Sequence, residues 1–507
     1  MAATLFVIVV TSIAILISWL YQSYKRNKIF GKIPSPAGLP ILGNAHQLES
    51  DGTKFYDQIM SYSEEFGRKG IFVIWLGTKP MVCMTRATDV EKLLNSSKHM
   101  DKSAEYRFLH PWLGTGLLTS TGAKWRSRRK MLTPTFHFKI LNDFLAVFNE
   151  QSDVMLSKLK EKAGPNSFNI FNDITLCALD IICETAMGRD VNAQSNSDSP
   201  YVNSVYKMSE LALNRMKQPW HWPDILYNLI GPGKEHDKCL RILHGFTEKV
   251  IAEKKEELLN GGPSVHDNSI DSAEEDQYVG TKKTRLAFLD MLLNMSEPSL
   301  TSEEIREEVD TFMFEGHDTT AAGINWATYL IGADQSIQER LQNELDSIFG
   351  DSERYPTMED LKDMKYLECC IKESLRLYPS VPLFGRTLTE DAVIDGFTIP
   401  KGTTGNLVVT ALHRDPEYFP DPDVYDPDRF SHNNATTRHP YAYIPFSAGL
   451  RNCIGQRFAL LEEKVLLSTI FRNFRVESLQ KRDELRPTGE LILRPEQGIV
   501  VRLTPRK

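Results

Sequence analysis

The most constraining feature of this 507-residue chain is a single cysteine held in a glycine-rich turn near the C-terminus. Cys453 lies between Gly449 and Gly455, two residues after Arg451, and an apolar helical pattern begins at Gln456. The glycines favour a turn that delivers the sulfur to the start of this helix. Backbone N–H groups and the helix dipole favour negative charge there, and Arg451 adds a nearby cation. We therefore expect the sulfur to ionise easily to a thiolate.

The pattern Phe446, Gly449, Arg451, Cys453 and Gly455 resembles the axial-ligand loop of the haem-thiolate monooxygenases, the cytochrome P450 superfamily. The resemblance implies that Cys453 is the fifth ligand of haem iron, where a thiolate favours cleavage of dioxygen, and that Phe446 contacts the cofactor. It also implies the cytochrome P450 fold. For the motif alone, the alternative is a buried structural cysteine in a glycine-rich turn.

A second motif interrupts a long predicted helix that begins at a capping box formed by Thr301 and Glu304. Within this helix Gly316, Asp318 and Thr319 are poor helix formers, so function is the better reason for their presence. They resemble the oxygen-activating stretch of the same superfamily. The resemblance implies that Gly316 opens the helix surface above iron, and that Asp318 exchanges protons with bulk water while Thr319 delivers them to dioxygen. The alternative for Thr319 is a hydroxyl bonded to the carbonyl one turn earlier.

Glu315 shares a helix face with Thr319, because residues four apart project in the same direction. It lies beside Phe312 and Phe314, and a carboxylate on such a buried face is costly unless its charge is removed. The run Glu308–Thr320 resembles cytochrome P450 family 4, which implies that Glu315 forms an ester with a haem methyl. The alternative is a glutamate that bonds nearby backbone or pairs with a cation.

Three charged residues resemble the Glu-Arg-Arg triad of the superfamily. Glu373 and Arg376 are three apart on a predicted helix over 367–377, a spacing that is also common on solvated helices. Arg429 follows in a proline-containing loop, Pro422–Phe430. The resemblance implies a structural role, in which the triad holds the cysteine loop to the core.

Several cations are candidates to bind the two haem propionates, because carboxylates in a buried pocket need compensating charge. Trp125 and Arg129 share one face of a predicted helix, and the resemblance places both at a propionate. Arg386 and Arg451 are further candidates. The segments 101–116 and 201–222 are expected to line the pocket.

Arg126, Arg128 and Lys130 point away from the face of Arg129. They form either a basic patch suited to an acidic redox partner or an ordinary solvated face. The chain has no glycine-rich dinucleotide segment. We therefore expect electrons from NADPH through a separate cytochrome P450 reductase, with cytochrome b5 as a further candidate partner.

Residues 1–21 are apolar and carry no charged side chain, and about twenty such residues span a bilayer as a helix. Lys25, Arg26 and Lys28 follow, which predicts that this end faces the cytosol. We expect a single-pass anchor in the endoplasmic reticulum membrane, a basic and proline-rich hinge over 22–40, and a cytosolic haem-thiolate monooxygenase domain over 41–507. The alternative, a cleaved signal peptide, would place its basic residues first.

The rest of the chain reads as mainly helical with small sheets. Short strands are predicted at 70–75 and 81–85, a hairpin turn at Asp395-Gly396, and a polar surface loop over 260–284. A net charge of −8 with interspersed basic residues argues against nucleic-acid binding. Seven cysteines without a CxxC pattern argue against a disulfide framework and against zinc.

Together the motifs predict a membrane-anchored, haem-dependent monooxygenase that inserts one atom of dioxygen into a C–H bond of a lipophilic substrate. The family 4 resemblance implies terminal (omega) hydroxylation of fatty acids or related lipids. The alternatives are a haem-thiolate isomerase or dehydratase of oxygenated lipids, a hydroxylase of hormones or xenobiotics, and a non-catalytic haem sensor or carrier.

Overall fold

The computed structural model describes residues 28–196, 198–260, 288–294, 300–435 and 438–506, together with single residues between 4 and 21. Most of the predicted anchor, the start of the predicted hinge and almost all of the predicted loop over 260–284 lie outside the described residues. Within the part of the chain that is described, no helix is both long enough and apolar enough to cross a membrane.

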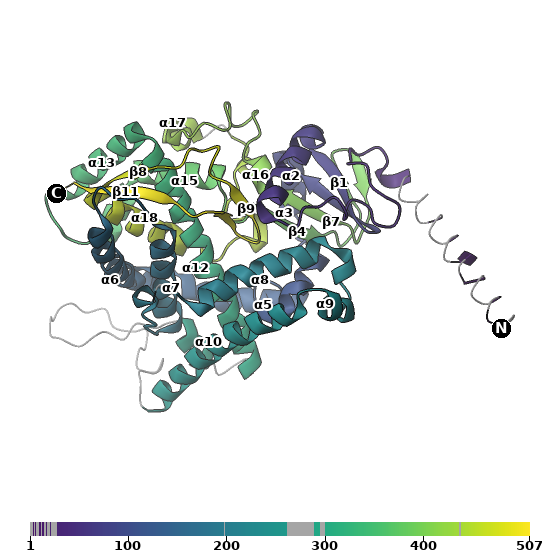
Figure 1. Ribbon diagram of the computed structural model, residues 1–507, viewed down its shortest axis with the longest axis horizontal. Coiled ribbons are helices and arrows are strands. Elements are labelled where there is room, and N and C mark those ends of the chain that lie inside the picture. The colour runs from purple at the N-terminus through teal and green to yellow at the C-terminus, as the bar shows by residue number, and fades with distance from the viewer. Residues whose placement is uncertain are drawn as a thin grey trace.

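Helices make up most of the described structure, as predicted, and they surround the long helix α12 (Figure 1). Their bounds are α2 Gly52–Glu65, α3 Ala87–Leu94, α4 His110–Leu113, α5 Gly122–Leu132, α6 Phe138–Lys162, α7 Phe171–Met187, α8 Pro200–Lys217, α9 Asp224–Ile230, α10 Gly233–Leu259, α11 Phe288–Asn294, α12 Ser302–Ala333, α13 Gln335–Phe349, α14 Met358–Asp363, α15 Lys365–Leu377, α16 Val409–Leu412, α17 His432–Ala435 and α18 Gln456–Asn473.

The strands form small sheets. One sheet has the order β1 (Ile71–Leu76), β2 (Lys79–Met84), β7 (Thr404–Val408) and β4 (Leu383–Thr387), with β2 and β7 parallel and the other pairs antiparallel. A second has the order β3 (Phe168–Asn169), β11 (Val500–Pro505) and β8 (Phe474–Ser478). Two hairpins pair β5 (Ala392–Ile394) with β6 (Phe397–Ile399) and β9 (Pro487–Gly489) with β10 (Leu493–Pro495).

Local sequence signals explain several of these elements. The predicted hairpin is confirmed: Asp395 and Gly396 both have positive φ, at 47° and 77°, as a two-residue hairpin turn requires. The capping box at the start of α12 is also confirmed, since Thr301 and Glu304 each accept the other's backbone N–H.

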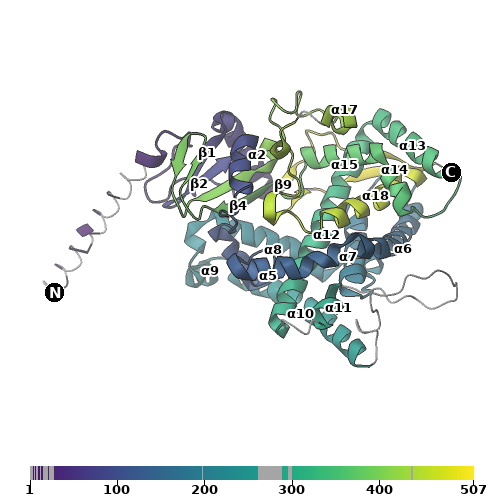
Figure 2. The same cartoon turned by 180° about the vertical axis from the view of Figure 1, so that it is seen from behind.

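Helix α12 runs through the centre of the molecule and is buried along almost its whole length. It packs against α7, α15 and α18, while the four-stranded sheet lies towards one end of the molecule (Figures 1 and 2). The cysteine loop precedes α18, so the packing of α18 on α12 brings the two predicted chemical motifs together.

The second half of the predicted hinge packs on this sheet. Phe30 and Ile33 are buried, and the backbone N–H of Val73 on β1 donates to the Pro34 carbonyl at 2.9 Å. The segment from residue 28 to residue 40 is therefore fixed to the domain by apolar burial and by the sheet edge.

Candidate functional site

A large cavity lies between the middle of α12, the cysteine loop, the segment after Asp101 and β4. It contains about 1620 Å³ of space not filled by atoms, part of which is open to solvent. Its lining is mainly apolar with a few polar groups, as is common for small-molecule and cofactor sites. The predicted site residues that line it are Trp125, Arg129, Glu315, Gly316, Thr319, Arg386, Phe446, Arg451 and Cys453.

The cysteine loop is held by backbone geometry. The Cys453 N–H donates to the Phe446 carbonyl at 2.9 Å, and the turn Gly449–Arg451 precedes the cysteine. Gly449 has φ +70°, and a Cβ there would overlap the Leu94 carbonyl oxygen. Only glycine therefore fits at position 449. The Cys453 side chain at the end of this loop is exposed and lines the cavity.

The ionisation of Cys453 differs from the sequence-based expectation. Desolvation by the protein around the cavity, with the nearby Glu315, raises the pKa of the thiol to about 11, although the Gly455 N–H and Arg129 act to lower it. Arg451 does not serve as the expected cation, because its guanidinium donates to the carbonyls of Met100, Leu117, Leu118 and Ser120. The protein's own groups therefore do not stabilise a thiolate, whereas a bound metal cation does.

Two cations at the cavity, the buried Arg386 and the half-buried Lys102, form no ion pair with a described carboxylate. Arg386 is 2% exposed and donates to the Gly385 carbonyl at 3.3 Å. Lys102 pairs with Arg386 in an isolated backbone bridge, and burial, then Arg386 and Arg451, lower its pKa well below its ordinary value. Among the described residues, no carboxylate oxygen lies within 4.0 Å of either cation. Uncompensated cations suit a ligand that carries carboxylates, as the haem propionates do.

Lys102 was not singled out from the sequence, although the segment that contains it was expected to line the pocket. It belongs to no helix or strand, and its relevance comes from Arg386, which lies far away in the sequence. No local motif identifies such a pair.

Helix α5 contacts the cysteine loop at one wall of the cavity. Arg129 donates to the Asn452 backbone carbonyl at 2.7 Å and to its side-chain oxygen at 2.8 Å, next to Cys453. The Arg451 guanidinium lies 4.8 Å from the centre of the Trp125 ring. Trp125 and Arg129 therefore hold the cysteine loop as well as facing the cavity.

The basic patch beside Arg129 is smaller than the sequence suggested. Arg128 is buried, bonds Glu304 and lies 3.5 Å from a Glu308 oxygen, so it connects α5 to α12. Arg126 and Lys130 are exposed. The prediction of a basic patch formed by three residues is wrong, because the buried Arg128 cannot contact a redox partner.

Glu315 faces the cavity, and its carboxyl has a raised pKa. Burial raises the pKa of its carboxyl to about 7, although Lys102 and Arg451 lower it. Within the described residues, the Glu315 carboxyl has no ion pair within 4.0 Å. The alternative of a tight pair with a cation is therefore absent there, and the carboxyl is available to a ligand in the cavity.

The neighbouring residues on α12 have well-defined partners. The Thr319 hydroxyl donates to the Glu315 carbonyl at 2.6 Å, the helical back-bond that was the alternative for this residue. The Thr319 hydroxyl proton is used in this bond. The hydroxyl oxygen still has a lone pair that can accept a hydrogen bond from a ligand in the cavity. A Cβ at Gly316 would lie 2.6 Å from Ile182 on α7, so this glycine also permits close helix packing.

Asp318 points away from the cavity and is 1% exposed. Arg494 binds both of its carboxylate oxygens, one of them at 2.9 Å, and also donates to Glu490 at 2.7 Å. Asp318 therefore has no direct contact with bulk water in this structure, and its role in proton exchange stays a prediction.

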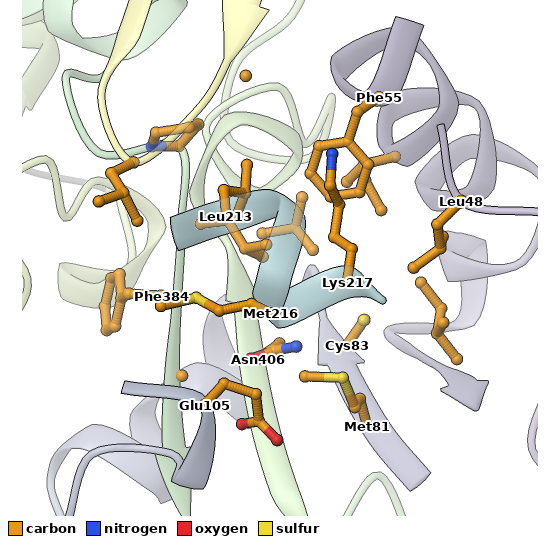
Figure 3. A pocket seen from close by; sticks show the side chains of 18 of the residues that line it. Leu48, Phe55, Met81, Cys83, Glu105, Leu213, Met216, Lys217, Phe384 and Asn406 are labelled. Atoms are coloured by element: carbon orange, nitrogen blue, oxygen red, sulfur yellow. The ribbon is translucent and has the colours of Figure 1, made fainter. Parts of the chain in front are cut away.

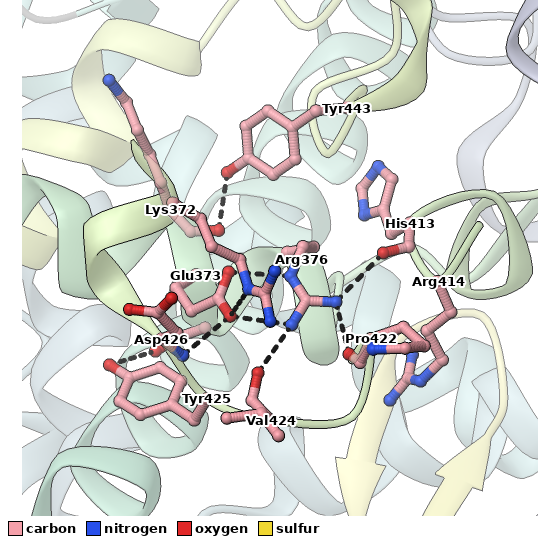
Figure 4. Close-up of polar contacts among 12 residues, drawn as sticks. Lys372, Glu373, Arg376, His413, Arg414, Pro422, Val424, Tyr425, Asp426 and Tyr443 are labelled. Atoms are coloured by element: carbon pink, nitrogen blue, oxygen red, sulfur yellow. Dashed lines mark hydrogen bonds and ion pairs between the residues drawn. The ribbon is translucent and has the colours of Figure 1, made fainter. Parts of the chain in front are cut away.

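The three triad residues lie together, and two of them, Glu373 and Arg376, are seen in Figure 4. Arg376 donates to both oxygens of Glu373 at 2.7 Å, and Arg429 lies 3.4 Å from the same carboxylate. Arg376 also donates to three backbone carbonyls, those of His413, Pro422 and Val424. Glu373 accepts the Asp426 N–H at 2.9 Å, so α15 is tied to the whole segment 413–429.

The cavity has a cysteine sulfur at one wall, the long helix α12 at another and two cations without ion-pair partners among the described residues, an arrangement that fits the class of haem-thiolate proteins. A family model described as Cytochrome P450 matches residues 33–503. The chain belongs to the cytochrome P450 family and is a monooxygenase of that family. Proteins of this family use haem iron as cofactor, and they consume dioxygen and electrons delivered by a redox partner.

Similar proteins carry the family 4 designation. The chain is 53% identical to Cytochrome P450 4V2 from Homo sapiens over 478 aligned residues. The alignment covers 94% of this chain and 90% of that protein. Over 500 residues it is 49% identical to Cytochrome P450 4c3 from Drosophila melanogaster, with 97% and 93% covered. The resemblance to family 4 is thereby confirmed.

Proposed function

We propose that this enzyme hydroxylates fatty acids or related long-chain lipids at or near the terminal methyl group. The observation that carries the proposal is the unpaired Glu315 carboxyl at the cavity, because an ester to haem fixes the cofactor relative to the substrate. The terminal methyl is less reactive than the internal carbons. Its selection therefore requires a rigid site that controls which carbon approaches iron.

The residues that would hold haem are Cys453 at iron, Glu315 at a ring methyl, and Lys102 and Arg386 at the propionates. Bound haem supplies the activation of dioxygen from which one atom is inserted into the C–H bond. Thr319 offers a hydroxyl oxygen towards the cavity, and Asp318, held by Arg494, is the neighbouring acid on α12 to which we assign proton supply.

The ester is tested by extraction of haem with acidified organic solvent. Haem should stay with the wild-type protein and leave the Glu315→Ala variant. Glu463 also lines the cavity, and burial raises the pKa of its carboxyl to about 8, so Glu463→Gln is a matched control that should retain haem. Complete extraction from the wild type would refute the ester.

The activity is tested in a system that contains NADPH, cytochrome P450 reductase and, in parallel, cytochrome b5. Fatty acids, hormones and xenobiotics are offered separately, and the products are identified by mass spectrometry. We expect omega-hydroxylated fatty acids. Products from hormones or xenobiotics alone would refute the assignment of substrate, and turnover of hydroperoxides without NADPH would favour isomerisation.

We further propose that residues 1–21 anchor the enzyme in the endoplasmic reticulum membrane, with residues 22–40 as the connection to a cytosolic domain over 41–507. The support is the charge pattern of the sequence. Alkaline carbonate should fail to release the full chain from membranes but should release a chain that begins at residue 22. Release of both would refute the anchor.

A further inference from the structure

A second pocket lies beside the haem cavity and is lined mainly by apolar side chains. It contains about 1090 Å³ of space not filled by atoms, part of it open to solvent, between α2, the four-stranded sheet and the C-terminal end of α8. Leu48, Phe55, Met81, Leu213 and Met216 contribute to its walls (Figure 3). Such a lining suits a hydrocarbon chain.

The two cavities share wall residues. Tyr106, Leu383, Phe384 and Leu491 line both. A ligand in the second pocket therefore lies against the same side chains as a ligand in the haem cavity, and a long chain has apolar wall along both.

Lys217, the last residue of α8, is the single lysine or arginine among the described residues that line the second pocket. It is 4% exposed, and its Nζ lies 4.1 Å from the centre of the Phe55 ring (Figure 3). The ammonium group donates to the carbonyls of Glu49 at 2.8 Å and Ser50 at 3.4 Å, which leaves one N–H.

The charge of Lys217 is not neutralised by a direct partner. In the described part of the chain, no carboxylate oxygen lies within 4.0 Å of its Nζ. Burial lowers the pKa of Lys217 to about 8, while more distant acids, Glu490 first among them, raise it. A bound anion would compensate this buried charge.

The acids of the same pocket differ in this respect. Glu490 accepts a hydrogen bond from Arg494 at 2.7 Å, and Glu105 accepts one from Thr404 at 3.4 Å. Both acids have side-chain partners within the protein, whereas the described partners of Lys217 are two neutral backbone carbonyls and an aromatic ring.

We propose that Lys217 binds the carboxylate of a fatty-acid substrate, whose hydrocarbon chain lies along the second pocket with its methyl end in the haem cavity. This inference rests on the proposed function. It assigns a reason for terminal attack: with the carboxylate held at α8, the far end of the chain is the part that reaches the haem cavity.

The test compares Lys217→Met with Lys217→Arg and with Lys207→Met. Lys207 lies on the same helix, outside the pocket, and pairs with Glu210 at 2.9 Å. Methionine suits the apolar walls, so we expect Lys217→Met to fold and bind haem. Loss of a charge-assisted hydrogen bond should raise KM and the spectral binding constant for the fatty acid about tenfold or more, with a smaller change in kcat.

The same measurements on the methyl ester of that fatty acid provide the chemical control. The ester lacks the charge, so Lys217→Met should bind it about as well as the wild type does. Lys217→Arg should retain most of the affinity for the acid, and Lys207→Met should match the wild type. Equal losses for acid and ester, or no loss for the acid, would overturn the inference.

A charge reversal gives a gain of function. Lys217→Glu should bind a long-chain alkylamine more tightly than the wild type does, by spectral titration and by calorimetry. If the wild type hydroxylates no fatty acid, the proposed function fails. If it does so and Lys217→Met behaves like the wild type, the inference alone fails.

Discussion

Replacement of Glu373 by alanine removes the carboxylate that neutralises Arg376 inside the protein. Both side chains are completely buried, and the change deletes two hydrogen bonds of 2.7 Å from Arg376 and the acceptor for the Asp426 N–H. The guanidinium keeps its three backbone carbonyls but loses its counter-charge.

Removal of one partner from a buried ion pair typically costs ~3–5 kcal/mol, because a buried charge is left uncompensated. Arg376 still donates to three backbone carbonyls in the Glu373→Ala variant. We therefore expect the free energy of unfolding to fall by an amount near the lower value, about 3 kcal/mol. Proteins are commonly stable by only ~5–15 kcal/mol, so this loss is a large fraction of the total.

A nearby surface pair provides the matched control. Arg340 on α13 binds Asp428 at 2.9 Å, in the same segment as Arg429, but the two side chains are 54% and 47% exposed. Exposed pairs contribute ~0–1 kcal/mol, so Asp428→Ala should change stability little.

Urea unfolding followed by far-UV circular dichroism measures both variants, and the reduced carbon monoxide spectrum reports on the thiolate–haem bond. We expect a lower midpoint and a weaker thiolate-type spectrum for Glu373→Ala, because the triad holds the segment before the cysteine loop. Equal midpoints for Glu373→Ala and Asp428→Ala would refute the reasoning from burial.

Further predictions concern the surroundings of the loop. Burial and Arg376 lower the pKa of His413 to about 3, so the unfolded chain binds the extra proton as pH falls below ~6.5. Stability should therefore fall from pH 6.5 towards pH 3 by up to ~1.4 kcal/mol per pH unit from this group, and His413→Gln should remove that part of the slope in unfolding titrations. Gly449→Ala should displace the cysteine loop from Leu94 and reduce the haem content measured at the Soret band, whereas Gly402→Ala, also at positive φ but with open space around it, should not. Arg386→Gln should raise the Kd for haem about tenfold, measured by titration of the haem-free protein at the Soret band.

Much of the fold follows from local patterns. The capping box at Thr301, the turn at Asp395-Gly396 and the apolar period of α12 are properties of neighbouring residues, and each is present where the sequence predicted it. The position of Cys453 before α18 is equally local. Such features depend on backbone conformation and on nearby hydrogen bonds, which a short segment determines by itself.

Partnerships between distant charges were not predictable in this way. Arg494 lies 176 residues from Asp318 in the sequence. Arg128 likewise pairs with acids on α12 that lie far from it in the sequence. Arg451 was expected beside the cysteine sulfur, yet backbone carbonyls from the segment 100–120 bind it instead. The energy of a buried charge depends on everything packed around it, and sequence spacing does not report that.

The sequence by itself determined the class of chemistry, since Cys453 and the α12 motif required only local backbone geometry and residue type. The tertiary structure alone decided which cations remain uncompensated. The half-buried Lys102 and the buried Arg386 at the haem cavity, and the buried Lys217 at the second pocket, stand out because packing removes water from them while no described carboxylate replaces it. That imbalance arises only when distant segments pack together.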